Sequence, residues 1–124
     1  MENIVVFGKL VSDSNRLKII KLLLSQPLCV CELMKVLKLN QPCISQHLSI
    51  LKQHQLLKSQ REGKWVVYEI DSNALNRFLK EINKFCHAPL ATIATLKQSC
   101  STLNKLRNKG LLRYNSVQSL NKHE

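Results

Sequence analysis

The stretch that decides the fold runs from Pro27 to Ile70: PLCVCELMKVLKLNQPCISQHLSILKQHQLLKSQREGKWVVYEI. It predicts two short helices joined by a tight turn and followed at once by a two-stranded hairpin. The first helix spans Val30 to Leu37, where apolar residues recur at helical spacing. The second begins at Asn40 or Gln41, with Pro42 in its first turn, where a missing backbone N–H costs nothing.

The second helix of this stretch has two chemically different faces. Ile44, Leu48 and Leu51 recur at i, i+4 and i+7 and are expected to face a core. The opposite side carries hydrogen-bonding groups and a single charge: Gln41, Ser45, Ser49 and Lys52. Such a face suits the reading of base edges, and the pattern is that of a helix-turn-helix that enters the major groove while phosphate contacts position it.

After the second helix the hydrophobic pattern changes to a period of two. Two runs, Lys58 to Arg61 and Lys64 to Ile70, flank Glu62 and Gly63, and Gly63 permits a tight turn. Arg61 and Lys64 then lie near the tip of a hairpin, or wing, that can touch the DNA backbone or minor groove. The alternative is a surface ribbon that only covers the core.

Further helices are expected on both sides: Glu2 to Val11, an apolar helix that begins at Asp13 or Ser14, one that begins at Asp71 or Ser72, and, beyond Pro89, Leu90 to Lys109. The apolar helix should lie at the centre of the core. The last one carries an apolar seam typical of helix pairing. Because the composition turns polar at Gly110, the sequence predicts one domain, residues 1–109, and a flexible tail, residues 110–124.

Length and charge narrow the classes of function. The 124 residues suit one domain that gains buried surface by oligomerising. The 19 Lys+Arg against 8 Asp+Glu, a formal net charge of +11, indicate a polyanionic partner, the alternative being a merely basic protein. No stretch predicts a membrane span. An enzyme is the least favoured class, because there is no glycine-rich phosphate loop and the acidic residues are few and scattered.

Five cysteines without a signal peptide predict a reducing cytoplasm, where thiols act as metal ligands or redox sensors. Cys29 and Cys31 flank Val30. On a regular helix these thiols would point to nearly opposite sides, so they share one ion only if the helix start is non-helical or unwinds. Distortion of that first turn is therefore the predicted switch, and the helix N-terminus should lower the cysteine pKa. The alternative is that each cysteine is a small buried hydrophobe.

Soft thiolates select soft ions, so arsenite or antimonite, zinc, cadmium or lead are admissible guests. Cys86, next to His87, is the candidate third ligand if it reaches across a dimer, with Cys43 and Cys100 ranked lower. Two alternatives keep the DNA binding. In one the signal is oxidation or persulfidation of a cysteine pair, such as Cys86 with a thiol of a second chain. In the other the protein binds DNA constitutively.

The motifs LCVCEL, QPCISQHLSILK and REGKWVVYEI together resemble the ArsR/SmtB family of small winged-helix repressors, and within it the arsenic-responsive repressors. The resemblance covers about Ser12 to Ile70. It implies a mainly α fold with a small β-hairpin, dimeric through its N- and C-terminal helices. It also implies an imperfect inverted repeat of double-stranded DNA as operator, no permanent cofactor, and release when As(III) or Sb(III) binds. The matching DNA-reading positions are Gln41, Ser45, Gln46 and His47.

Two positions qualify this resemblance. His47 lies between the core row and the exposed row, so it either contacts a phosphate or bonds a backbone carbonyl and orients the helix. The family's arsenic pattern continues with a third cysteine where this chain has Met34, a weak thioether donor, so water or a small thiol would complete the ligand set. The family's other site, of carboxylates and histidines on the C-terminal helix, has no counterpart because Leu90 to Lys109 contains no Asp, Glu or His.

Overall fold

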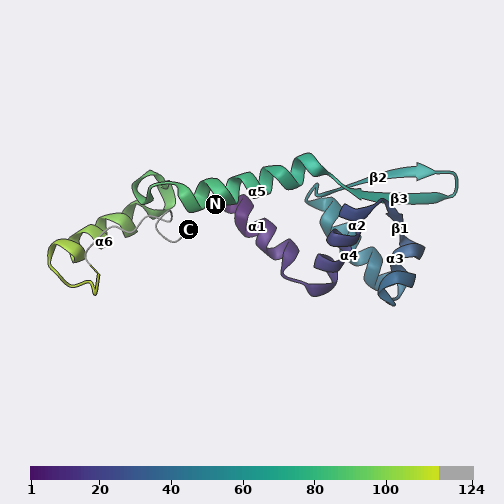
Figure 1. The fold of residues 1–124 in the computed structure, drawn as a ribbon, viewed down its shortest axis with the longest axis horizontal. Coiled ribbons are helices and arrows are strands. Elements are labelled where there is room, and N and C mark those ends of the chain that lie inside the picture. Colours follow the sequence, from purple (N-terminus) through teal and green to yellow (C-terminus); the bar gives the residue numbers. More distant parts are fainter. Residues whose placement is uncertain (115–124) are drawn as a thin grey trace. The chain divides into compact units, whose positions relative to one another are not determined.

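The computed structural model describes residues 1–114, and its contacts divide the chain into two units, residues 1–81 and residues 82 onward. The first unit contains, in order, α1 (Glu2–Val11), α2 (Ser14–Ser25), β1 (Leu28–Cys29), α3 (Val30–Leu37), α4 (Gln41–Gln53), β2 (Leu57–Glu62), β3 (Trp65–Ile70) and most of α5 (Ser72–His87) (Figure 1). The second contains the end of α5, the short 3-10 turns η1 (Leu90–Thr92) and η2 (Ala94–Leu96), and α6 (Lys97–Asn108). No helix within residues 1–114 has the length and apolar character that crossing a bilayer requires.

Side-chain caps set the starts of α2, α4 and α5. The Asp13 carboxylate accepts from the backbone N–H of Arg16 at 3.1 Å at the start of α2. The Asn40 side chain accepts from the N–H of Cys43 at 2.9 Å at the start of α4, and Asp71 caps α5 in the same way. The predicted caps are therefore confirmed, and the predicted bounds of α1 and α3 are those observed.

The sheet has three antiparallel strands in the order β1-β3-β2, not the two that the sequence predicted. Strands β2 and β3 pair from Leu57↔Ile70 to Glu62↔Trp65, and Gly63 adopts φ 61 in the turn between them. The additional strand β1 pairs Cys29 with Val67. A two-residue strand shows no alternation of its own, so only its partner strand reveals it.

The core lies where α1 to α4 meet the start of the sheet, and seven side chains are almost completely buried in it: Leu10, Ile19, Leu33, Ile44, Leu48, Leu51 and Leu56. The three predicted core positions of α4 are among them. Helix α2 buries Ile19, Ile20 and Leu23 but leaves Leu17 and Leu24 about half exposed. Part of its apolar surface therefore lies outside the core at whose centre the sequence placed it.

Truncation of the α4 core should destabilise the protein strongly. Ile44 is fully buried, so Ile44→Ala is expected to lower the free energy of unfolding by about 2–5 kcal/mol through lost burial and a residual cavity. Urea denaturation at fixed protein concentration measures this loss. The matched control is Ser45→Ala, an exposed neighbour that should change the free energy of unfolding by less than about 0.5 kcal/mol. Equal effects of the two changes would contradict the assigned packing.

In the second unit, the prediction of one helix from Leu90 to Lys109 is wrong, because two short turns precede α6. The hydroxyl of Thr92 donates to the carbonyl of Pro89 at 2.6 Å, and Ile93 takes an extended conformation between the two short turns. These local bonds and the β-branched side chains compete with the helix, which therefore begins only at Lys97. The predicted domain and tail boundaries stay predictions, and residues 115–124 of the predicted tail lie outside the described residues.

Candidate DNA-reading surface and thiol pair

Helices α3 and α4 form the predicted helix-turn-helix. Lys38, in the left-handed region at φ 56, ends α3, and Asn40 opens α4 two residues later. With its apolar row buried, α4 leaves its predicted base-reading side chains exposed: Gln41, Ser45, Gln46, Ser49 and Lys52. The Lys52 ammonium donates to the Ser59 hydroxyl at 2.7 Å, which ties the end of α4 to β2.

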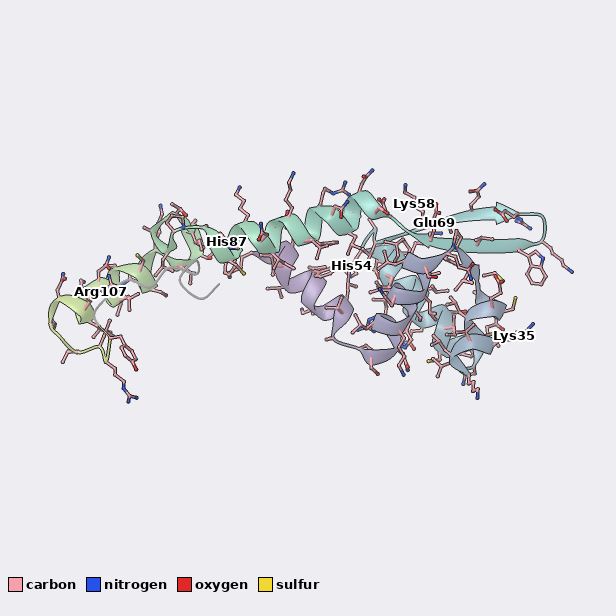
Figure 2. All side chains as sticks on the ribbon, in the orientation of Figure 1. Lys35, His54, Lys58, Glu69, His87 and Arg107 are labelled. Carbon is pink, nitrogen blue, oxygen red and sulfur yellow. The ribbon has the colours of Figure 1, made fainter. Side chains whose placement is uncertain are left out.

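The wing carries positive charge at its tip. The Nε of Arg61 donates to the carbonyl of Gly63 at 3.3 Å, and the Lys64 ammonium lies 5.0 Å from the centre of the Trp65 ring. Nearer the base, Lys58 lies opposite Glu69 in the register of the two strands (Figure 2). The charges at the base are therefore balanced, whereas the tip carries two exposed cations beside Glu62.

His47 is placed differently from the other predicted reading residues. Its Nδ1 lies 3.4 Å from Nη1 of Arg16, and its Nε2 lies 3.8 Å from the carboxylate of Asp13. Its side chain is 11% exposed. The backbone N–H of Arg16 holds the pKa of Asp13 below its usual value, and the nearby imidazole acts in the same direction, although partial desolvation opposes both.

The two sulfurs of Cys29 and Cys31 are 3.0 Å apart. Cys29 is the N-cap of α3, with an extended backbone at φ −92 and ψ 169, so only Cys31 lies within the helix. The side chains therefore converge without any unwinding. The non-helical start that the sequence left open is what occurs, and a distorted first turn is not needed to bring the sulfurs together.

Cys29 also heads a capping box. Its sulfur accepts from the backbone N–H of Glu32, and its own N–H donates to the Glu32 carboxylate at 3.0 Å, which lowers the pKa of Glu32. Burial raises the pKa of the Cys29 thiol to about 11, and the Cys31 thiol and the Glu32 side chain act in the same direction. The prediction of a lowered pKa is thus wrong for Cys29, because burial outweighs the helix N-terminus.

An open groove adjoins this thiol pair. Its lining comes from β1, α3, α4 and the wing: Cys29, Val30, Cys31, Met34, Gln41, Trp65 and Val66. The first residue of α4 and the first two residues of β3 therefore border the space next to the sulfurs. Sequence reasoning missed Trp65 and Val66 here, because only the folded sheet brings the wing to the start of α3.

The remaining cysteines belong to other elements of the chain. Cys43 is half-buried in α4, while Cys86 and Cys100 belong to the second unit. Among residues 1–114, no three side chains of the types His, Cys, Asp or Glu gather closely enough to hold a metal ion. Within this part of one chain the pair has no third ligand of these types.

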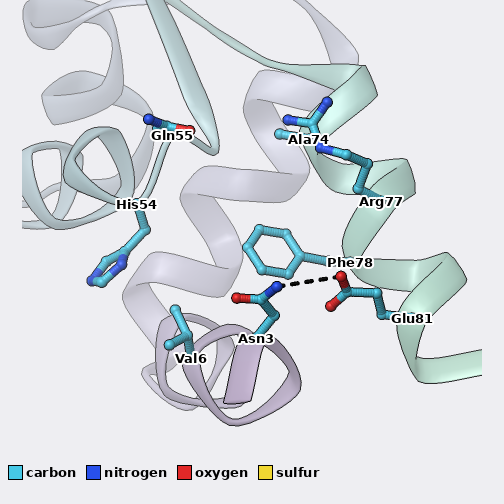
Figure 3. A pocket seen from close by; sticks show the side chains of 8 residues that line it. All are labelled: Asn3, Val6, His54, Gln55, Ala74, Arg77, Phe78 and Glu81. Carbon is cyan, nitrogen blue, oxygen red and sulfur yellow. Dashed lines mark hydrogen bonds between the residues drawn. The ribbon is translucent and has the colours of Figure 1, made fainter. Parts of the chain in front are cut away.

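A second hollow lies between α1, α5 and the turn after α4 (Figure 3). Asn3 of α1 donates to Glu81 of α5 at 3.3 Å across it, and His54 and Arg77 also line it. The ring of Phe78, in its wall, stacks on Phe7 of α1 at 5.0 Å between ring centres. No thiol lines this hollow, so it is distinct from the groove beside Cys29.

Comparison with known proteins adds to this geometry. Residues 13–59 match the family described as bacterial regulatory proteins of the arsR family. A helix-turn-helix-type transcriptional regulator of Methanocaldococcus jannaschii, MJ1325, is 38% identical over 77 residues, which cover 61% of this chain and 86% of that protein. The arsenical resistance operon repressor of Escherichia coli is 45% identical over 64 residues, covering 50% of this chain and 54% of the repressor.

Solved structures show the same likeness. HlyU from Vibrio cholerae superposes with a TM-score of 0.58 and 30% identity, covering 68% of this chain and 91% of that one. A structure of reduced HlyU gives the same TM-score and identity and is covered to 88%. The structural match to HlyU therefore agrees with the family indicated by the sequence matches. The family consists of transcriptional regulators and not of enzymes. This chain belongs to the ArsR/SmtB family of winged helix-turn-helix, DNA-binding transcriptional repressors.

Proposed function

We propose that this repressor leaves its operator when trivalent arsenic or antimony binds Cys29 and Cys31. The observation that carries the proposal is the convergence of two sulfurs, 3.0 Å apart, in a groove that also touches the base-reading helix and the wing. The wild-type resting state is the DNA-bound protein, acting in a reducing cytoplasm where both thiols stay free.

The DNA side of the proposal rests on the exposed face of α4 and the tip of the wing. The contacts that we propose are Gln41, Ser45, Gln46, Ser49, Lys52, Arg61 and Lys64. A homodimer on an imperfect inverted repeat would place two such surfaces in successive major grooves. Two half-exposed apolar side chains, Val5 of the N-terminal helix α1 and Leu79 of α5, support pairing of two copies through these helices.

The chemistry of the pair favours a neutral guest. Arsenous acid, As(OH)₃, condenses with two thiols to give two As–S bonds and two waters, so no charge enters the buried site. A dication needs two thiolates, and burial opposes thiolate formation at Cys29. Zinc, cadmium and lead are therefore second to arsenite and antimonite. The remaining hydroxide of the arsenic, or a small thiol that replaces it with release of a third water, would occupy the third position, since Met34 supplies only a thioether.

The connection to DNA follows from the sheet. Cys29, in β1, pairs with Val67 of β3, and Trp65 and Gln41 line the groove beside its sulfur. A guest held by both sulfurs occupies that groove and presses between the wing and the start of α4. Because both elements must fit one DNA site together, a shift of either lowers affinity.

The test is a titration of the DNA complex with four ions. Wild-type protein, reduced with a phosphine because dithiols compete for arsenite, is bound to the fluorescent promoter duplex of its own gene, and anisotropy follows release. Arsenite and antimonite are expected to release the DNA at lower concentrations than cadmium or lead. If none of the four ions releases it, the sensing proposal fails and the assignment to a DNA-binding family remains.

A second candidate signal is oxidation of the same pair. Two thiols 3.0 Å apart can form a disulfide with hydrogen peroxide, which takes two electrons and two protons and leaves as two waters. Mass spectrometry of peroxide- or sulfide-treated protein distinguishes this reaction, or persulfidation, from ion binding. Release by oxidant with no response to arsenite would favour it, and insensitivity to every thiol reagent would favour a constitutive regulator.

The cations of the wing should contribute phosphate contacts. Arg61→Ala and Lys64→Ala are each expected to lower the slope of log affinity against log salt by about one, because one fewer counterion is released on binding. The matched control is Lys80→Ala on α5, outside both the helix-turn-helix and the wing, which should leave the slope unchanged. If the slopes of the wing variants are unchanged, the hairpin makes no phosphate contact through these residues and only covers the core.

A further inference from the structure

Arg16 connects three elements of the first unit. Its Nε donates to the carbonyl of Leu10 and its Nη2 to the carbonyl of Lys9, each at 3.0 Å, in the last turn of α1. Its Nη1 lies 3.4 Å from Nδ1 of His47 on the base-reading helix. One guanidinium therefore binds the C-terminal carbonyls of α1 and the side of α4 at once.

The geometry around His47 selects the tautomer of the neutral ring. A guanidinium nitrogen only donates, so Nδ1 must be the acceptor and the proton of the neutral ring sits on Nε2. That Nε2 faces the Asp13 carboxylate at 3.8 Å, beyond hydrogen-bond range. Among residues 1–114, Asp13 and Arg16 are the charged groups in contact with the ring, and both stand at the start of α2.

We propose that His47 is a positioning residue for DNA reading, held by Arg16, and not a phosphate contact. The neutral imidazole fixes the angle of α4 against the junction of α1 and α2. An 11% exposed side chain with both ring nitrogens turned to its own protein has little surface to offer a phosphate. The proposal rests on the DNA-binding family of the chain and not on its response to any ion.

Protonation of this ring breaks the link to Arg16. A proton on Nδ1 removes the acceptor and places two cations 3.4 Å apart, while Asp13 attracts the ring toward the other side. The lowered pKa of Asp13 keeps its carboxylate ionised when the ring gains a proton. Specific DNA affinity should therefore fall on acidification.

The two possible roles of His47, positioning α4 or contacting a phosphate, predict opposite changes of DNA affinity on acidification. The probe is a duplex selected for wild-type binding from a random pool, with a scrambled duplex for non-specific binding, at constant ionic strength. From about pH 7.5 to 5.5, wild-type affinity for the selected duplex is expected to fall about tenfold, the size of an ordinary coupling between sites. A phosphate contact would instead strengthen binding to both duplexes, because the ring gains positive charge.

Substitutions complete the test. His47→Gln keeps an oxygen that accepts from Arg16 but cannot take up a proton, so it should bind like wild type at about pH 7.5 and lose the pH dependence. His54→Gln, at the exposed end of α4, is the matched control and should keep the wild-type profile. Arg16→Lys, which cannot reach all three acceptors, should already weaken binding at about pH 7.5.

Three results would overturn the proposal. One is a wild-type affinity that does not fall on acidification. Another is a His47→Gln variant that keeps the wild-type fall, which would assign the titration to another group. The third is a His47→Gln variant with a normal melting curve that weakens binding to both duplexes and lowers the salt slope by about one, which is the signature of a lost phosphate contact.

Discussion

Replacing both Cys29 and Cys31 with serine is expected to leave DNA affinity unchanged and to abolish release by arsenite. Loss of a partner outside the ligand shell already costs roughly 10–100-fold in metal affinity, so loss of both sulfur ligands should raise the arsenite concentration for half-release by more than about a hundredfold. Anisotropy of the promoter duplex measures DNA affinity when protein is titrated without arsenite, and it measures release when arsenite is titrated into the preformed complex.

Serine is the right substitution because Cys29 has a second role. Its sulfur accepts from the N–H of Glu32 in the capping box of α3, and a serine hydroxyl is a preferred cap at this position. Cys29→Ser should therefore keep the helix start that supports the groove. Cys29→Ala would remove the cap and lower the free energy of unfolding by about 1 kcal/mol, which would confuse a lost ligand with a loosened helix.

Single substitutions locate the ion. Cys43→Ser changes a half-buried cysteine of α4 that does not line the groove, and it should release DNA at the wild-type arsenite concentration. If Cys86→Ser weakens the response, Cys86 is the third ligand, supplied in a dimer as the sequence suggested. If the variant with serine at both Cys29 and Cys31 still releases DNA on addition of arsenite, the ion binds elsewhere and the proposed mechanism is wrong.

Local sequence patterns predicted most of the first unit because each depends on neighbouring residues. The buried row Ile44, Leu48 and Leu51, the cap at Asn40 and the bounds of α3 all follow from helical periodicity and capping. The helix from Leu90 failed where hydroxyl bonds and β-branched residues near Ile93 outweigh the apolar seam. The sequence alone does not show which of these opposing interactions is stronger.

The chemistry of the thiol pair was less predictable because it depends on the tertiary structure. The spacing of Cys29 and Cys31 identified the residues, but pairing of β1 with β3 sets the extended backbone that brings their sulfurs together. Burial, which raises the pKa of Cys29, likewise comes from the packed core and overrides the helix N-terminus. The Arg16 link to His47 joins residues far apart in the sequence and could not be inferred from either segment.

The raised pKa of Cys29 gives the second large prediction, a difference in pH dependence between two ions. Because this pKa is about 11, the thiol keeps its proton between about pH 6 and 8.5, and cadmium must displace that proton to bind. Each displaced proton makes affinity rise about tenfold per pH unit, so cadmium affinity should rise ten- to about a hundredfold per unit as one or two protons leave. Calorimetry in buffers of different ionisation heat counts the protons directly.

Arsenite should show almost no such dependence. Neutral As(OH)₃ takes up both thiol protons as it releases water, so two As–S bonds form without net proton release. Folding does not disturb the comparison, because a raised thiol pKa leaves the free energy of unfolding constant below the ordinary cysteine pKa and lowers it only as the pH rises toward 11. Equal slopes for both ions would show that Cys29 binds as a preformed thiolate, and the preference for a neutral guest would then lose its physical basis.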